Sequence, residues 1–350
     1  MTHDNTQKYR IVSPVEVQHE VVEDYHKRSQ YGTQLGWQTT HNKITLVPKT
    51  FSLWYGWPGH GKTTVGLCVM AQIAKREKKR FLLYCREEGE PKDLTNLLAS
   101  IWIGRQFYPG GDNRMNVAQL NSAIADLSQY FTIIDGRLDG FEQLIAVTAE
   151  TEKQHSTKFW GVMADPLNTL VRGGERIAAM YEEGLMAIHD DAKEKNRHYM
   201  LFTHPGSDSD KKEKTEAGIT YQPPPTPYNL KGGRTLYDMG YLMVGVWRPP
   251  LGLAHGGIQY EKNEIHLIAS KVKPRGSGET GTYKLYYDLE RFNYYELDGT
   301  TPRFANDGTA SESPKAEQQP MKFEPNKYFD ASLPPSDRIT QPEPDDHLPF

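Results

Sequence analysis

The stretch FSLWYGWPGHGKTT, residues 51–64, decides the fold class of this chain. It joins an apolar run of strand length to the loop pattern G-x-x-x-x-G-K-T and then to a segment of helical spacing from Thr63 to Lys75. Glycines in such a loop let backbone N–H groups wrap phosphate oxygens, and the following helix N-terminus adds a favourable dipole. We therefore expect a nucleoside triphosphate at this loop, contacted by Gly56, Trp57, Pro58, Gly59, His60, Gly61, Lys62, Thr63 and Thr64.

Two residues at the end of the loop carry the phosphate chemistry. Lys62 is expected to reach the β- and γ-phosphates, and the hydroxyl of Thr63 to ligate Mg²⁺. A glycine-rich turn that binds nothing is the alternative. The complete spacing between a strand and a helix argues against it.

Apolar runs of strand length recur along the chain, and segments of helical spacing separate the earlier ones. This alternation indicates a mostly parallel sheet covered on both faces. We expect an α/β fold of the P-loop NTPase type that ends in a β-hairpin formed by 282–288 and 291–297. The runs before the hairpin are 80–85, 130–135, 158–165, 198–204, 241–247 and 264–272, and the helical segments are 120–127, 141–150 and 176–195.

A second residue on the Mg²⁺ side of the site is expected at the end of a neighbouring buried strand. Asp165, at the end of GVMAD, fits this place, although an aspartate there can also cap the next turn. Asp135 in FTIID is the weaker rival because GRLDG, an ordinary turn, follows it.

Hydrolysis also needs a group that orients and partly deprotonates water. Glu87 is the candidate, with Glu88 as the second choice and a solvated charged turn as the alternative. Lys273 and Arg275 stand two residues apart near the end of the core and suit a phosphate outside their own subunit. Plain surface cations are the alternative for this pair.

Charge and composition bound the domain organisation. Nine of the 45 acidic and five of the 41 basic residues lie in 301–350, which leaves 36 of each sign in the first 300 residues. Because 301–350 also holds nine of the 23 prolines, we assign it as a disordered acidic tail. Residues 1–33 are expected to hold a disordered start and a short helix after Ser13, and 34–300 one ATPase core.

The sequence carries no apolar run long enough for a membrane span and no signal-peptide pattern, so we expect a cytoplasmic protein. Its balanced charge excludes a basic, histone-like nucleic-acid binder. Cys68 and Cys85 fall in core-like segments and are expected to be buried free thiols.

Several ordered motifs between residues 30 and 297 together resemble the hexameric, RecA-like helicases of the DnaB and Twinkle type (superfamily 4). They are the P-loop segment, LLYCREEGEPKDL, GVMADPLNTL, MLFTHPG, GGRTLYDMGYLMVGVWR and KVKPRGSGETGTYKL. The resemblance implies that Glu87 is the catalytic glutamate, Asp165 the Walker B aspartate and His204 the γ-phosphate sensor. It also implies that Lys273 and Arg275 are the piston lysine and arginine finger that act on the neighbouring subunit's ATP.

Two features bear on how far this resemblance carries. The sensor in that family is usually glutamine, whereas this chain has His204 in THPG, as in the related plasmid RepA-type ATPases. The helix after Ser13 resembles the linker helix that docks on an adjacent subunit, and packing on its own core is the equal alternative.

In the same family, the loops after the Walker B and sensor strands hold single-stranded DNA. Here they correspond to 170–176 and to the polar, Pro-rich loop 206–233, whose acidic residues also allow a plain solvated loop. Cations on these loops would give salt-dependent, sequence-independent binding. The candidates are Arg172, Lys211, Lys212, Lys214, Lys231 and Arg234.

The end of the tail, QPEPDDHLPF (341–350), resembles the acidic tip of bacterial single-stranded-DNA-binding proteins. Two acids and a terminal carboxylate can pair with cations around a pocket that buries Phe350. We expect this tip to bind a host replication or repair protein, with competition against DNA as the alternative. The tip residues are Asp345, Asp346, Leu348, Pro349 and Phe350.

Together these features favour an ATP- and Mg²⁺-dependent DNA helicase of replicative type, which translocates on single-stranded DNA as a homo-oligomeric ring, expected to be a hexamer. The first alternative is a RecA/Rad51-like recombination or annealing mediator that coats DNA as a filament. The second is a nucleotide-switched ATPase of a replication or partition system that never unwinds DNA. A bacterial chromosome, a phage or a plasmid would each be a fitting source.

Overall fold

The computed structural model of this 350-residue chain describes residues 12–27, 32–108, 113–171, 176–206, 212–215, 218–253 and 259–305. The chain divides into two units, Met1–Asp307 and Gly308–Phe350. The second unit lies outside the described residues, and with it the predicted tail tip.

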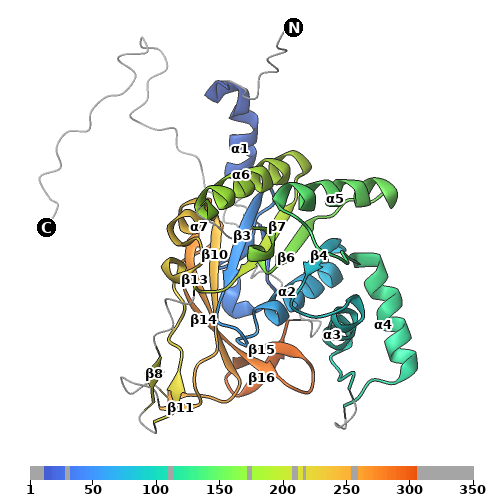
Figure 1. Ribbon diagram of the computed structural model, residues 1–350, viewed down its shortest axis with the longest axis vertical. Coiled ribbons are helices and arrows are strands. Elements are labelled where there is room, and N and C mark those ends of the chain that lie inside the picture. The colour runs from blue at the N-terminus through green and yellow to red at the C-terminus, as the bar shows by residue number, and fades with distance from the viewer. Residues whose placement is uncertain are drawn as a thin grey trace, which may run out of the picture. The chain divides into compact units, whose positions relative to one another are not determined.

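A ten-stranded sheet forms the centre of the first unit (Figure 1). Its strands are β3 (Thr50–Tyr55), β4 (Phe81–Cys85), β5 (Phe131–Ile133), β6 (Gly161–Asp165), β7 (His198–Thr203), β10 (Leu242–Trp247), β13 (Glu264–Val272), β14 (Gly281–Asp288), β15 (Asn293–Asp298) and β16 (Thr301–Phe304). They lie in the order β16-β15-β14-β13-β10-β3-β7-β6-β4-β5. The strands from β10 to β5 in this order are parallel, and the other four pair antiparallel. The predicted α/β class with a mostly parallel sheet is confirmed.

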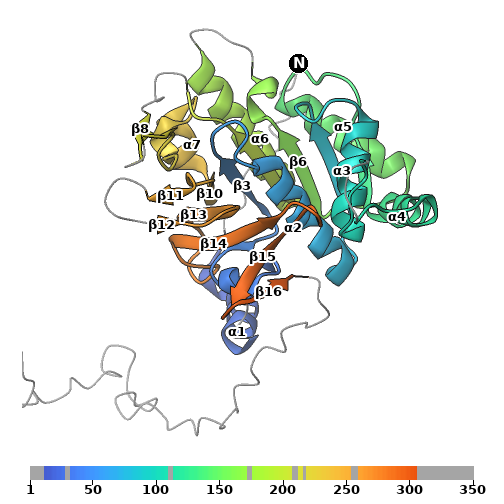
Figure 2. The same cartoon turned by 90° about the horizontal axis from the view of Figure 1, so that it is seen from below.

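Helices cover both faces of the parallel strands (Figure 2). They are α2 (Lys62–Glu77), α3 (Pro91–Ile103), α4 (Val117–Tyr130), α5 (Phe141–Gln154), α6 (Ile177–Lys195) and α7 (Gly233–Met239). Side chains alternate along each strand, so one strand serves two cores. In β3, Trp54 packs in the core with α2, α3 and α4, whereas Phe51 and Leu53 pack with α5, α6 and α7.

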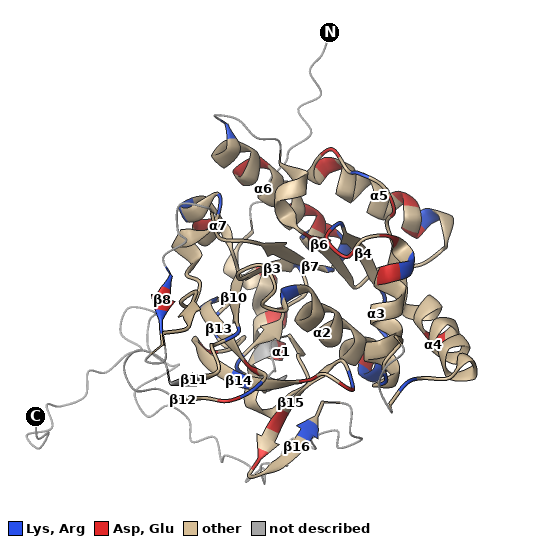
Figure 3. Ribbon diagram, turned by 60° about the horizontal axis from the view of Figure 1, so that its bottom comes forward, with Lys and Arg blue, Asp and Glu red and all other residues tan. Residues whose placement is uncertain are grey.

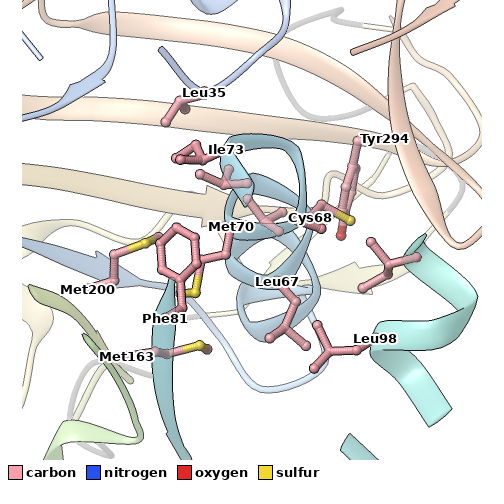
Figure 4. Close-up of a cluster of buried hydrophobic side chains, with 14 of the residues drawn as sticks. Leu35, Leu67, Cys68, Met70, Ile73, Phe81, Leu98, Met163, Met200 and Tyr294 are labelled. Carbon is pink, nitrogen blue, oxygen red and sulfur yellow. The ribbon is translucent and has the colours of Figure 1, made fainter. Parts of the chain in front are cut away.

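The helix after the P-loop is buried almost all round, which fixes the loop that precedes it. Figure 4 shows side chains of α2, such as Met70, among apolar side chains of the sheet, such as Phe81, Met163 and Met200. Each fully buried side chain of this size contributes on the order of 1.5–3 kcal/mol by leaving water. Cys68 belongs to this core and Cys85 ends β4; both are buried free thiols, as predicted.

The antiparallel end of the sheet is larger than predicted. The expected hairpin is present as β14 and β15, with Tyr286 opposite Tyr295. The chain then turns again, and β16 pairs with β15 through Phe304 opposite Tyr295. The ordered core therefore runs past the predicted boundary at residue 300, because four residues assigned to the tail complete an edge strand.

The N-terminal helix does not bury its apolar stripe. It consists of a 3₁₀ turn, Pro14–Val17, and α1, Gln18–Lys27, and it begins with the predicted capping box between Ser13 and Glu16. The stripe consists of Val17, Val21 and Tyr25; Val17 is half-buried, whereas Val21 and Tyr25 are 59% and 70% exposed. The alternative in which this stripe packs on its own core is therefore wrong.

Short elements complete the described chain. They are the strand pairs β1–β2 (Thr33–Gln34, Thr45–Leu46), β8–β9 (Glu213–Lys214, Thr220–Tyr221) and β11–β12 (Gly252–Leu253, Gln259–Tyr260), and the 3₁₀ turns Gln38–Thr40, Leu167–Leu170 and Pro227–Asn229. Among the described residues, no helix has the length and apolar character needed to cross a membrane.

Candidate nucleotide site and its surroundings

The glycine-rich loop connects β3 directly to α2, as the sequence predicts. β3 ends at Tyr55 and α2 begins at Lys62. Gly59 and Gly61 have φ values of +76° and +84°, a left-handed conformation that disfavours any side chain. The first N–H groups of α2 have no partner within the helix, so they are free to bind an anion at this loop.

Asp165 lies beside the P-loop, where the parallel strands end; we call this end of the sheet the P-loop edge. It is the last residue of β6, opposite Cys85 of β4, and the hydroxyl of Thr63 donates a hydrogen bond to its Oδ2 atom. Its other oxygen, Oδ1, is buried and has no hydrogen-bond partner among the described residues. Burial raises the pKa of Asp165 to about 6, and the Thr63 hydroxyl opposes that shift. A cation beside this carboxylate would satisfy the open oxygen.

The rival aspartate lies away from the loop. Asp135 is exposed and follows β5, which forms the outer edge of the parallel strands. Three strands, β7, β6 and β4, separate β5 from β3. The structure therefore brings Asp165, and not Asp135, to the P-loop.

Lys62 is buried at the mouth of the loop, with 4% of its surface exposed. Its Nζ atom donates to the carbonyl oxygen of Trp57 at 3.3 Å. Burial lowers the pKa of Lys62, and the charges of Asp165 and Glu87 oppose that shift. The ammonium group has a single long hydrogen bond among the described residues, which leaves it able to bind a phosphate.

Glu87 lies at the same edge, in the loop after β4. Its carboxylate contacts His204, the predicted sensor residue, which directly follows β7. His204 Nε2 lies 2.7 Å from Glu87 Oε1, which requires the ring proton on Nε2. This hydrogen bond is the main reason that the pKa of Glu87 is lowered. The other ring nitrogen of His204 is buried without a partner in the described part of the chain.

Glu88, the second choice from the sequence, also approaches the site, but from the Thr63 side. Burial and the neighbouring Glu87 charge raise the pKa of Glu88, while the nearby Thr63 hydroxyl opposes that rise. The loop after β4 is thus not a plain solvated turn. Figure 3 shows charged residues on this loop and at the start of α2.

Lys273 and Arg275 lie at the opposite edge of the sheet, where the parallel strands begin. Val272, the end of β13, is opposite Leu242 of β10, which is opposite Ser52 near the start of β3. From Ser52 to the end of β3 the strand extends roughly 10 Å at about 3.3 Å per residue. The turn after Arg275 is tied to the chain before β3, because Thr45 Oγ1 donates to the Ser277 carbonyl at 2.5 Å. Both cations are exposed and follow the strand end that lies away from their own P-loop, so neither is placed to reach it.

The loop predicted to bind DNA is partly a packed structure. We call residues 221–230 the strap. The indole of Trp57 donates to the Pro223 carbonyl and that of Trp247 to the Gln222 carbonyl, each at 2.8 Å. Pro225, Pro227 and Leu230 of the strap are buried. The alternative of a plain solvated loop is therefore wrong for this part of 206–233.

The predicted DNA-contacting cations fall in three groups. Lys231 and Arg234 follow the strap and are exposed. Lys212 and Lys214 lie on or beside the β8–β9 hairpin. Arg172 and Lys211 lie outside the described residues.

Two cavities adjoin the P-loop, and sequence reasoning found neither. One, of about 180 Å³, is lined by residues that include Thr64, Arg248 and Tyr287; the other, of about 560 Å³, includes His60, Arg248 and Tyr221. The backbone N–H of Arg248 donates to His60 Nδ1 at 3.1 Å, and burial lowers the pKa of His60 to about 4. Arg248 directly follows β10, and Tyr287 lies in β14. Neither belongs to a recognisable motif, so the sequence does not indicate them.

The sheet order, the loop between β3 and α2 and the acid at the end of β6 together define the class: this is a P-loop NTPase fold of the RecA-like type. Two solved structures have similar folds. One is described as an ATPase domain, and the other as "The Structure Of A DnaB-Like Replicative Helicase And Its Interactions With Primase".

Both similarities have the same strength. Each solved structure has a TM-score of 0.64 and 16% sequence identity to this chain. The match to the ATPase domain covers 83% of this chain and 100% of the other; the match to the DnaB-like helicase covers 82% and 69%. At this identity the likeness concerns the fold. No protein-family model and no curated protein matches the sequence.

Proposed function

We propose that this protein is an ATPase that translocates on single-stranded DNA, a helicase of the replicative type. The observation that carries the proposal is the division of polar and charged groups between two edges of one sheet. One edge holds Lys62, Thr63, Asp165 and Glu87. The other edge exposes Lys273 and Arg275. This division fits a nucleotide site completed by a second subunit.

ATP and Mg²⁺ fit the residues present at the P-loop edge. The buried, unpartnered Oδ1 of Asp165 and the lightly bonded ammonium of Lys62 are both groups that gain from such a ligand. Thr63 and Asp165 would hold Mg²⁺, which prefers few protein oxygens and otherwise keeps water and phosphate ligands. Bound there, the ion would neutralise charge that develops on the phosphates.

Glu87 is proposed to orient and partly deprotonate the attacking water. Glu87 is hydrogen bonded to His204, which lowers its pKa, so this glutamate is ionised at neutral pH, as a base must be. His204 would also respond to the γ-phosphate, in the place where DnaB-type helicases usually have glutamine. The proposed relation to RepA-type ATPases depends on this THPG motif.

The oligomer proposed is a homomeric ring, taken to be a hexamer. Lys273 and Arg275 would act on the ATP of the next subunit, where an arginine in trans stabilises transition-state charge. The exposed side chains of Val21 and Tyr25 on the apolar stripe of the N-terminal helix support docking of that helix on another subunit.

Single-stranded DNA is the proposed polymer substrate. Lys212, Lys214, Lys231 and Arg234, with Arg172 and Lys211, would contact its phosphates. We also propose that residues 345–350 recruit a host replication or repair protein, and that the protein works in the cytoplasm of a bacterial cell. Removing that tip should abolish the recruitment and leave ATP hydrolysis unchanged.

One experiment separates the proposed function from its alternatives. Purified protein should hydrolyse ATP faster with single-stranded DNA and should separate a forked duplex, and Lys62→Ala should do neither. Electron microscopy of negatively stained protein with ATP and single-stranded DNA should show rings. Filaments would favour the recombination mediator, and hydrolysis with an intact fork would favour the nucleotide-switched ATPase.

A further inference from the structure

The strap presents one aromatic ring to solvent. Tyr228 lies on the 3₁₀ turn Pro227–Asn229 and is 67% exposed, although residues before and after it in the strap are anchored. Pro227 is buried, and Leu230 is buried and bridged to Pro205. A large aromatic side chain held outward on a fixed backbone loses little conformational entropy when it binds a ligand.

A second ring, that of Tyr237, packs against Tyr228. Tyr237 of α7 lies with its ring centroid 5.0 Å from that of Tyr228, and the planes are tilted by 35°. Lys271 of β13 places its Nζ atom 4.8 Å from the centre of the Tyr237 ring, and it donates to the Asp238 carbonyl at 3.0 Å. The order Lys271, Tyr237, Tyr228 is thus a short stack whose last ring is open to solvent.

Two exposed cations follow Tyr228 closely in the chain. Lys231 follows it by three residues and is exposed, and the Arg234 side chain is 90% exposed. Among the described residues, the one ion pair of Arg234 is with Asp238 at 3.5 Å, of the exposed kind that contributes little. Figure 3 shows basic and acidic residues on and around α7. An aromatic ring among cations is the combination that binds single-stranded nucleic acid, because bases stack on the ring while phosphates meet the cations.

The backbone joins this surface to the catalytic edge. Gly206 N–H donates to the Asn229 carbonyl at 2.7 Å, directly after Tyr228 and two residues after His204. His204 in turn contacts Glu87. A ligand on Tyr228 would therefore contact a segment that is hydrogen bonded to Gly206, two residues after the sensor, and to Trp57 of the P-loop.

We propose that Tyr228 is a base-stacking residue for single-stranded DNA, with Tyr237 as its support. The proposal rests on the proposed function, and it adds base contacts to the phosphate contacts described above. Its ligand is any exposed base of a single strand, because every base offers a flat face.

The test uses fluorescence anisotropy with the full-length protein and two probes, a labelled twenty-nucleotide thymidine strand and an abasic strand of the same length. Tyr228→Ala should weaken binding of the thymidine strand about tenfold and leave binding of the abasic strand unchanged. Tyr228→Phe should bind as the native protein does, since it keeps the ring and loses only the hydroxyl group. Tyr108→Ala, which removes another exposed tyrosine, should have no effect on either probe.

Three results would overturn the proposal. In the first, Tyr228→Ala binds the thymidine strand with native affinity. In the second, its affinity falls equally for both strands. In the third, light scattering shows that the Tyr228→Ala oligomer differs in size from the native one, which would make Tyr228 a contact between subunits. If the native protein binds neither strand, the proposed function itself fails, and the two failures are therefore distinguishable.

Discussion

The two edges of the parallel sheet differ in how their charged side chains are held. At the P-loop edge, Lys62 and Asp165 are buried, and Glu87 is hydrogen bonded to His204. At the opposite edge, Lys273 and Arg275 are exposed, and neither forms an ion pair with the described residues. Buried polar groups with unused hydrogen-bonding capacity are typical of a ligand site. Exposed cations, in contrast, remain solvated by water until a partner binds them. The contrast supports the proposal that each subunit carries two different halves of one site.

Mixing two inactive variants tests this comparison most severely. Lys62→Ala and Arg275→Ala should each lower ATP hydrolysis about a thousandfold, since one loses the phosphate contact and the other the charge supplied in trans. If the halves lie on different subunits, an equal mixture should recover hydrolysis at about a quarter of its interfaces. The rate is measured by phosphate release from premixed, reassembled protein.

The control and the contrary outcome of this mixing experiment are both simple. Lys92→Ala removes an exposed lysine from α3 and should keep the native rate. A mixture that stays inactive, or an Arg275→Ala variant that no longer binds nucleotide, would show that Arg275 serves its own subunit or only the fold.

The second prediction separates the two acids after β4. Glu87→Gln should lower ATP hydrolysis about a hundredfold while nucleotide binding is kept, because a general base is removed. Glu88→Gln should lower it only a few-fold, since Glu88 approaches Thr63 and not the sensor. Single-turnover hydrolysis and binding of a fluorescent nucleotide give both numbers. If the larger loss falls on Glu88→Gln, the roles of the two residues are exchanged.

The third and smallest effect concerns pH. The His204 hydrogen bond holds the pKa of Glu87 below its ordinary value, so the ionised base persists to lower pH. His204→Ala removes the donor; the pKa of Glu87 then rises, and the acid limb of the hydrolysis profile should move to higher pH. At neutral pH Glu87 stays ionised, and the rate should fall about tenfold because the group that orients its carboxylate is lost. His204→Gln keeps an N–H donor and should leave the limb near its native position. An unmoved limb in His204→Ala would mean that another group limits the rate in acid.

The sequence predicts the P-loop edge well because each part of it is local. An apolar run ends and a functional residue follows, so Asp165 and Glu87 can be found from their own strands. The contacts between them were beyond prediction: that His204 meets Glu87, and that Glu88 reaches Thr63, depends on the sheet order. The order is set by tertiary packing and leaves no local pattern.

Elements that owe their structure to distant partners were missed. The strap is Pro-rich and polar, and its order comes from the indoles of Trp57 and Trp247, which lie far from it in sequence. The strand β16 begins in a segment whose composition indicates a tail, and pairing with β15 overrides that composition. The helix α3, with the run LTNLLASIW, was not predicted either, although its spacing is regular and it buries Leu94 and Leu98.

The burial of both native thiols has a practical consequence. Cys68 is fully enclosed by apolar side chains and Cys85 nearly so, and burial raises the pKa of each thiol. Thiolates, the form that reacts with maleimide dyes, are therefore scarce and shielded. A single cysteine introduced on the surface would take the dye almost alone, so single-molecule fluorescence of the moving protein requires no prior removal of cysteines.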